Sequence, residues 1–175
     1  YEGFDIDVAN EIAERLGVTV AWETPAWEAI TSGNWQDRWH ISVGSMSVTT
    51  ERAEVLDFAP AYYYTPAAVA VHADNTSIVD VSTDLDGKRI GACGGCTYDL
   101  FLQKTLEMPG YTFDFVIDDA EIVTYDTDST VIAEYLGGAS TSEEFVDRWR
   151  VPGEPRSRLW EERFGEMRYV PLGTE

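Results

Sequence analysis

Small hydroxyl residues and one arginine lie close together in the segment Gly44 to Arg52. Residues 41–48 read as a buried strand that runs into a turn, which would expose the backbone amides of Gly44 and Ser45 at the carboxyl edge of a sheet, where open α/β folds bind ligands. Three hydroxyl side chains would lie at the same edge: Ser45, Ser47 and Thr49. Arg52, at the start of a predicted helix, offers a planar fork that matches a carboxylate in two hydrogen bonds. The segment therefore indicates a site for a small polar molecule that carries a carboxylate.

The same residues also have a purely structural interpretation. Thr49 would then be the N-cap of the following helix, and Arg52 would be a surface cation paired with Glu51 or Glu54. Residue types alone leave both interpretations open.

Two cysteines, Cys93 and Cys96, form a C-G-G-C motif between a predicted strand (residues 88–93) and a predicted helix (residues 97–106). A small structural disulfide is reasonable in an exported protein. The layout also fits a thioredoxin-type redox site, in which the helix N-terminus lowers the pKa of the first thiol, although that fold would place the motif in its first βα unit. Two free thiols are the third possibility.

Strands and helices alternate along the chain, which predicts an α/β fold with mainly parallel sheets flanked by helices. The first helix is predicted from an N-cap at Asp5 to a stop at Gly17, with an apolar face at i, i+4 and i+8 (Val8, Ile12 and Leu16). Further helical segments are predicted at 25–30, 49–58 and 129–138, and further strands at 18–22, 62–73 and 120–125. The polar stretch 74–86 is the predicted boundary between two lobes.

A formal charge of −20 argues against nucleic acid and anionic lipid surfaces as partners. Neither His40 nor His72 has metal-ligand spacing, and no catalytic or cofactor motif is found, so we assign no metal, no cofactor and no catalytic residue. No signal segment or membrane span is visible. The chain begins directly before a helix and ends in a strand-like stretch, so we expect a fold that is incomplete at both termini.

Several sequence blocks taken together resemble family 3 of the bacterial extracellular solute-binding proteins. In chain order they are GFDIDVANEIAERLGV, WEAI, ISVGSMSVTTER, LDFAPAYYYTPAAVAV and DLDGKRIGACGGCTY, and the match runs from Tyr1 to about Gly138. These proteins are the polar amino-acid receptors of ABC importers. The resemblance implies a two-lobed clamp of the type II periplasmic-binding-protein fold, with residues 1–73 in a partial lobe 1, residues 74–168 in lobe 2 and residues 169–175 as a crossover strand.

The resemblance also implies roles for particular residues. Arg52 would bind the α-carboxylate of the ligand, helped by Gly44, Ser45 and Ser47, and Trp27 would form an aromatic wall. In the second lobe the family's glycine and two small hydroxyl residues correspond to Gly95, Cys96 and Thr97, whose amides at a helix start would suit an anion. The implied protein is a monomeric extracytoplasmic receptor that captures an amino acid between its lobes and docks on an ABC permease.

The chain departs from the family at the ligand's amino group. The aspartate that usually follows the AEYLGG helix has no visible counterpart, and Asp126, Asp128, Glu143 and Glu144 are unranked candidates. Two other functions are compatible with the resemblance. One is an enzyme similar to cyclohexadienyl dehydratase, which would require a poised acid in the cleft; the other is the ligand-sensing domain of a receptor.

Overall fold

The computed structural model describes residues 1–72, 74–128, 130–132 and 167–171. By their contacts the residues fall into two compact units. Unit 1 comprises residues 1–59 and 107–112, and unit 2 comprises residues 60–106 and 113–175. The predicted lobe boundary at residues 73 and 74 stays a prediction.

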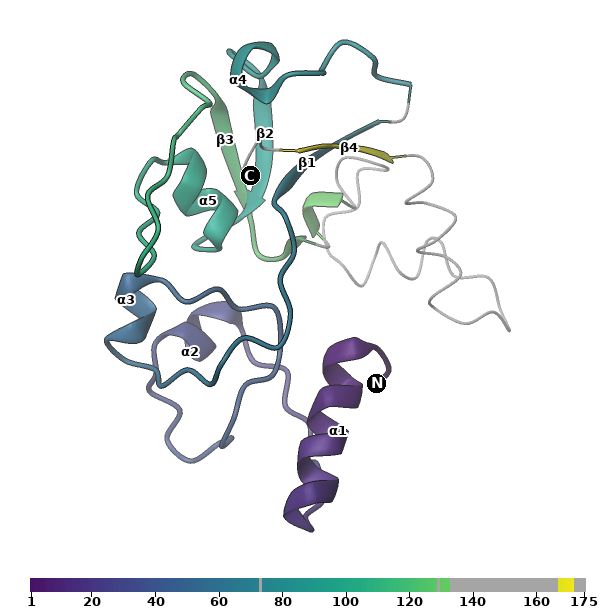
Figure 1. Ribbon diagram of the computed structural model, residues 1–175, viewed down its shortest axis with the longest axis vertical. Coiled ribbons are helices and arrows are strands. Elements are labelled where there is room, and N and C mark those ends of the chain that lie inside the picture. Colours follow the sequence, from purple (N-terminus) through teal and green to yellow (C-terminus); the bar gives the residue numbers. More distant parts are fainter. Residues whose placement is uncertain (73, 129, 133–166, 172–175) are drawn as a thin grey trace. The chain divides into compact units, whose positions relative to one another are not determined.

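Unit 1 contains three helices, which are α1 (Phe4–Leu16), α2 (Trp27–Thr31) and α3 (Thr50–Ala53) (Figure 1). Helix α1 ends at Gly17 as predicted, because this glycine takes the left-handed conformation (φ 68°) and its N–H donates to the carbonyl oxygens of Ala13 and Glu14. The predicted N-cap at Asp5 is wrong, since the helix begins at Phe4 after Gly3. Asp5 instead lies in the first turn, where a negative charge favours the helix dipole.

The buried side of α1 differs from the predicted apolar face. Ala9 and Ala13 are the buried residues, whereas Leu16 is 71% exposed. A face centred on residues 9 and 13 lies about 100° around the helix from one centred on residues 8, 12 and 16. The predicted face is therefore only partly covered within the described residues.

Two predicted strands of unit 1, at residues 18–22 and 41–48, do not form in the structure. A strand requires a neighbouring strand about 4.8 Å away to accept its backbone hydrogen bonds. Among the described residues of unit 1, neither segment belongs to a β-ladder, and Ile41 is 59% exposed. The segment 41–48 therefore lies as a loop.

Unit 2 contains a parallel pair of strands, β2 (Arg89–Cys93) and β3 (Glu121–Tyr125), which confirms the two predicted strands there. Helix α5 (Thr97–Leu102) follows β2, as Figure 1 shows. A second pair joins β1 (Ala68–His72) to β4 (Met167–Pro171) in antiparallel orientation. Strand β1 begins later than predicted, at Ala68, after Pro66, which has no N–H to donate to a ladder.

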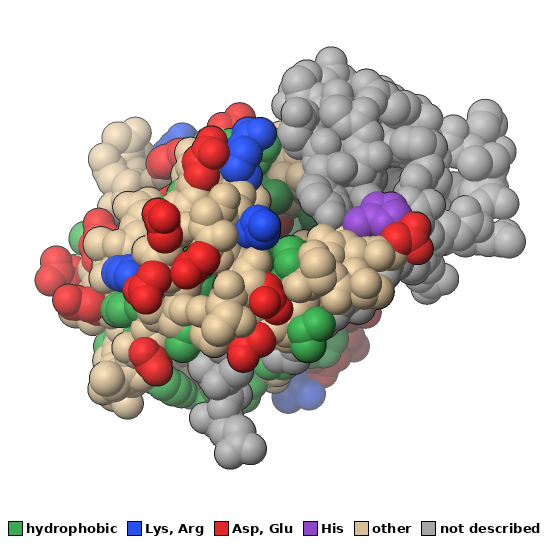
Figure 2. Space-filling view, turned by 90° about the horizontal axis from the view of Figure 1, so that it is seen from above, with side chains coloured by type: hydrophobic (Ala, Val, Ile, Leu, Met, Phe, Trp, Pro, Cys, Tyr) green, Lys and Arg blue, Asp and Glu red, His purple; other side chains and the backbone are tan. Residues whose placement is uncertain are grey.

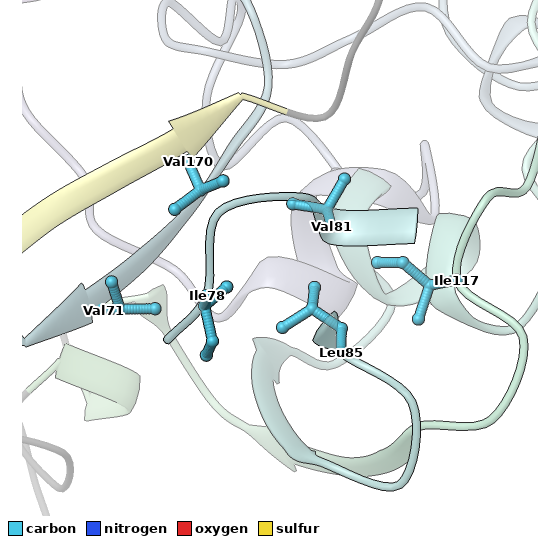
Figure 3. Packing of buried hydrophobic residues seen from close by; sticks show 6 residues of the cluster. All are labelled: Val71, Ile78, Val81, Leu85, Ile117 and Val170. Carbon is cyan, nitrogen blue, oxygen red and sulfur yellow. The ribbon is translucent and has the colours of Figure 1, made fainter. Parts of the chain in front are cut away.

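The core of unit 2 is an apolar cluster that draws on distant parts of the chain (Figure 3). Its buried members are Val71, Ile78, Val81, Leu85, Ile117 and Val170. The segment 74–86 supplies three of them, around the short helix α4 (Val81–Asp84), whose N-terminus is capped by the Asp80 carboxylate (2.9 Å from the Ser82 nitrogen). Although it is polar in composition, this segment therefore packs into unit 2.

The face drawn in Figure 2 carries many acidic side chains and few basic ones, in keeping with the net charge of −20. None of the helices in the described ranges has the length and apolar character needed to cross a bilayer. Within the same ranges, no three His, Cys, Asp or Glu residues come together as a possible metal site.

Candidate functional site

Arg52 is held in the first turn of α3 by the residues that precede it. The hydroxyl of Thr49 accepts a hydrogen bond from the Arg52 backbone N–H (3.2 Å), so Thr49 is the N-cap, as the structural interpretation of the sequence predicted. The Nη1 atom of Arg52 donates to the carbonyl oxygen of Ser47 (3.0 Å). Thr49 and Arg52 are 3% and 5% exposed, so the expectation of a surface arginine is wrong.

The guanidinium group of Arg52 also stacks on an aromatic ring. Its Cζ atom lies 5.0 Å from the centroid of Trp27, a half-buried residue at the start of α2. Burial lowers the pKa of Arg52, and the nearby charge of Glu51 acts in the opposite direction. An arginine stays charged at neutral pH even so, which places a desolvated positive charge with a planar fork of donors in unit 1.

The small residues before Arg52 lie on the loop that it fixes. Gly44 and Ser47 are half-buried and Ser45 is exposed. A tight turn joins the Met46 N–H to the Gly44 carbonyl oxygen (2.8 Å). Ser47 contacts Arg52 through its backbone carbonyl, which sequence reasoning did not foresee. A guanidinium group and hydroxyl groups are hydrogen-bond donors of the kind that can bind a carboxylate.

The C-G-G-C motif lies at the carboxyl end of β2, and the structure joins Cys93 and Cys96 as a disulfide (S–S 2.05 Å). Gly95 takes a left-handed conformation (φ 67°) in this turn. Its N–H donates to the Asp99 carboxylate (2.8 Å), and the N–H of Cys96 donates to the carbonyl oxygen of Cys93 (3.1 Å). Two of the amides that were predicted to meet an anion thus donate within the protein, and Thr97 begins α5 directly after them.

Asp99 is a residue that sequence reasoning missed. It is 4% exposed, and besides Gly95 its carboxylate accepts a hydrogen bond from the side chain of Gln103 (2.7 Å). The available signal was its position, the third of α5, where an acidic side chain can reach back to a backbone N–H before the helix. Asp99 fixes the shape of the turn that carries Gly95.

One of the candidates for the ligand's amino group, Asp128, lies where a helical turn begins after β3. Desolvation raises the pKa of its carboxyl group, whereas a hydrogen bond from the Cys93 backbone N–H lowers it. Its exposed position limits the desolvation. Asp126 directly follows β3, and Glu143 and Glu144 lie outside the described residues.

Residues 1–165 match the family model described as bacterial extracellular solute-binding proteins, family 3. Among similar curated proteins, the L-arginine-binding protein of Pseudomonas aeruginosa is 27% identical over 136 residues, which cover 78% of this chain and 49% of that protein. The L-cystine-binding protein TcyJ of Escherichia coli (strain K12) is 23% identical over 168 residues, covering 89% of this chain and 59% of that protein. The chain thus spans about half the length of the curated relatives it matches.

Solved structures share the fold. An ancestral arginine-binding protein bound to arginine has a TM-score of 0.65 at 23% identity, covering 96% of this chain and 68% of that one. Holo ArgBP from T. maritima has a TM-score of 0.68 at 22% identity, covering 96% and 66%. These similarities confirm the predicted α/β fold of the type II periplasmic-binding-protein class, of which this chain covers a part. Together with the match over residues 1–165, they show that the chain belongs to the bacterial extracellular solute-binding proteins, family 3.

Proposed function

We propose that the chain functions as an extracytoplasmic receptor that captures an amino acid or a similar carboxylate-bearing solute and delivers it to an ABC permease. The family supports this proposal, since its members are extracellular solute-binding proteins. Two relatives, an L-arginine-binding protein and an L-cystine-binding protein, support an amino acid as the class of ligand.

The observation that carries the proposal is the placement of Arg52. Burying a guanidinium group is costly unless it has partners, and the Ser47 carbonyl and the Trp27 ring supply two here. A desolvated arginine attracts a carboxylate more strongly than an exposed one, because water screens the charge less. We therefore propose that Arg52 binds the carboxylate of the ligand, with Gly44, Ser45 and Ser47 beside it and Trp27 as an aromatic wall.

Unit 2 carries the other proposed contacts, Gly95, Cys96 and Thr97. Because the amides of Gly95 and Cys96 donate to Asp99 and Cys93, the hydroxyl of Thr97 is the polar side chain of this turn that we propose for the ligand.

Isothermal titration against a panel of amino acids tests the proposal. We expect one or more of them to bind, and we expect Arg52→Lys to weaken that binding about tenfold, because lysine keeps the charge but loses the two-donor fork. Arg38→Lys is the matched control, since Arg38 also stacks on a tryptophan of unit 1 but is exposed. Failure of the whole panel to bind, or equal binding by the Arg52→Lys variant, would contradict the proposal.

A non-enzymatic role is part of the same proposal, because the relatives named above are binding proteins. Incubation with prephenate or arogenate, with product formation as the readout, separates this role from that of a dehydratase-like enzyme. We expect no turnover by a protein that binds an amino acid from the panel.

A further inference from the structure

The disulfide of unit 2 covalently joins the end of a strand to the start of a helix. Cys93 is the last residue of β2, and Cys96 is the N-cap of α5, which begins at Thr97. Only Gly94 and Gly95 separate the two cysteines. The bond therefore restricts the turn that directly precedes Thr97, the residue whose hydroxyl group we propose for the ligand.

The backbone of this turn has hydrogen bonds that do not depend on the sulfur atoms. The Gly95 N–H donates to the Asp99 carboxylate (2.8 Å), and the Cys96 N–H donates to the carbonyl oxygen of Cys93 (3.1 Å). A cross-link that closes so short a loop also adds less stability than one that closes a long loop. We therefore expect unit 2 to stay folded when the disulfide is reduced.

The two cysteines differ in their access to an incoming group. Cys93 is 4% exposed, whereas Cys96 is half-buried. The tip of the turn between them is open, because a Cβ atom added at Gly95 would meet no atom within 4 Å. Thiol–disulfide exchange requires access to the sulfur that is attacked, so Cys96 is the cysteine that an incoming thiolate reaches.

The buried cysteine has acceptors for the proton of a free thiol. The Sγ atom of Cys93 lies 3.8 Å from the carbonyl oxygen of Gly94 and 3.9 Å from that of Asp126. A disulfide sulfur carries no hydrogen, so these are only contacts in the oxidised form, whereas a thiol can donate to either oxygen. The surroundings of Cys93 thus suit both redox states.

We propose that the Cys93–Cys96 disulfide is a redox site that controls ligand affinity, and that its reduction by a small dithiol weakens binding. The inference rests on the proposed function, because the turn carries a proposed ligand contact. A disulfide that holds a loop in its binding conformation raises affinity, since less conformational entropy is lost on binding. Reduction restores that entropy cost and leaves the Thr97 hydroxyl in the chain.

The reaction is an exchange in two steps. A thiolate of the dithiol attacks the Sγ atom of Cys96, the bond between the cysteines breaks, and Cys93 leaves as a thiolate that takes up a proton. The second thiolate of the dithiol then attacks the reagent's own sulfur in the mixed disulfide, and Cys96 leaves and is protonated in turn. The protein gains two electrons and two protons, and the dithiol loses them as it becomes a disulfide.

Titration calorimetry with an amino acid that the chain binds, before and after treatment with excess dithiothreitol, tests the inference. We expect reduction to weaken binding about fivefold, because the turn is no longer held in place. Mass spectrometry after alkylation counts the thiols, and circular dichroism shows whether the reduced chain stays folded. By linkage, saturating ligand should disfavour reduction by about the same factor in a buffer of fixed dithiothreitol redox ratio.

The matched control is the double variant Cys93→Ala/Cys96→Ala, which lacks the cross-link under all conditions. We expect it to bind with the affinity of the reduced wild-type chain and to show no response to dithiothreitol. If the double variant loses affinity in dithiothreitol as the wild-type chain does, the effect comes from the reagent, and the inference is refuted.

The remaining outcomes separate this inference from the proposed function. Equal or higher affinity of the reduced chain refutes the redox control and leaves the proposed function in place. Unfolding on reduction has the same meaning, since the disulfide would then be purely structural, and so has a disulfide that stays intact in excess dithiothreitol. If no amino acid of the panel binds to either form, the proposed function fails and the redox control fails with it.

Discussion

Unit 1 contains two arginines that stack on tryptophans, and they differ in burial. Arg52 lies over Trp27 with 5.0 Å between the guanidinium carbon and the ring centroid, and Arg38 lies over Trp39 at 4.6 Å. Each guanidinium also donates to a backbone carbonyl oxygen, that of Ser47 for Arg52 (3.0 Å) and that of Trp35 for Arg38 (3.1 Å). Arg52 is 5% exposed, whereas Arg38 is exposed.

The difference between these pairs shows that stacking geometry alone does not mark a binding arginine. Near water a cation–π contact contributes about 0.5–1 kcal/mol, and it contributes about 2 kcal/mol when the pair is desolvated. The N-cap hydroxyl of Thr49 further fixes the backbone of Arg52, while the backbone N–H of Arg38 donates only to the Trp35 carbonyl oxygen (3.0 Å). Burial and the cap therefore make Arg52 the better candidate for a ligand contact.

Replacing each arginine with alanine tests this comparison with the largest expected effect. Arg52→Ala should abolish measurable binding of the amino acid that the wild-type chain binds, and should lower the free energy of unfolding by about 2 kcal/mol through lost packing and a carbonyl left without its donor. Arg38→Ala should change the stability by less than about 0.5 kcal/mol, because it is a surface substitution. Titration calorimetry and thermal unfolding measure the two effects.

Loss of binding to the same degree in both alanine variants would contradict the proposed difference between Arg52 and Arg38. Loss of stability with full affinity in Arg52→Ala would also contradict it, since Arg52 would then only stabilise the loop at Ser47.

Part of the structure around Arg52 could be predicted from the sequence. Thr49 as an N-cap depends on residues near in the sequence, and so does the glycine stop of α1. The contact of Arg52 with Trp27 joins residues that are distant in the sequence, and no periodicity encodes it. For the same reason the segment 41–48 is predicted as a buried strand but forms a loop, since a short apolar run does not show whether a partner strand lies beside it.

The turn at residues 93–98 shows the same limit of prediction from the sequence. The sequence placed Gly95, Cys96 and Thr97 at a helix start, but the direction of their amides depends on the reach of the Asp99 side chain. The hydrogen bond from the Cys93 N–H to the Asp128 carboxylate likewise depends on the parallel pairing of β2 and β3, which joins distant parts of the sequence.

Removal of the N-cap should have an intermediate effect, and it tests how much the cap contributes to the difference between Arg52 and Arg38. Thr49→Ala should lower the free energy of unfolding by about 1 kcal/mol, because the Arg52 N–H loses its acceptor in a buried site. Ligand affinity should fall less than in Arg52→Ala, since the guanidinium group remains. Thr49→Ser keeps the hydroxyl and serves as the control, and chemical denaturation with calorimetry gives both values. Equal stability of the alanine and serine variants would contradict a role for the cap.

Exchange of each tryptophan for phenylalanine gives the smallest expected effect and isolates the ring. Trp27→Phe should weaken ligand binding about two- to fivefold, because phenylalanine attracts a cation less strongly than tryptophan does. Trp39→Phe should leave affinity unchanged and stability equal or slightly higher, because the indole Nε1 of Trp39 is buried with no hydrogen-bond partner among the described residues. Calorimetry and thermal unfolding of the two variants side by side make the measurement. A loss of affinity in Trp39→Phe as large as that in Trp27→Phe would mean that the two stacks are equivalent, and burial would then no longer distinguish Arg52 from Arg38.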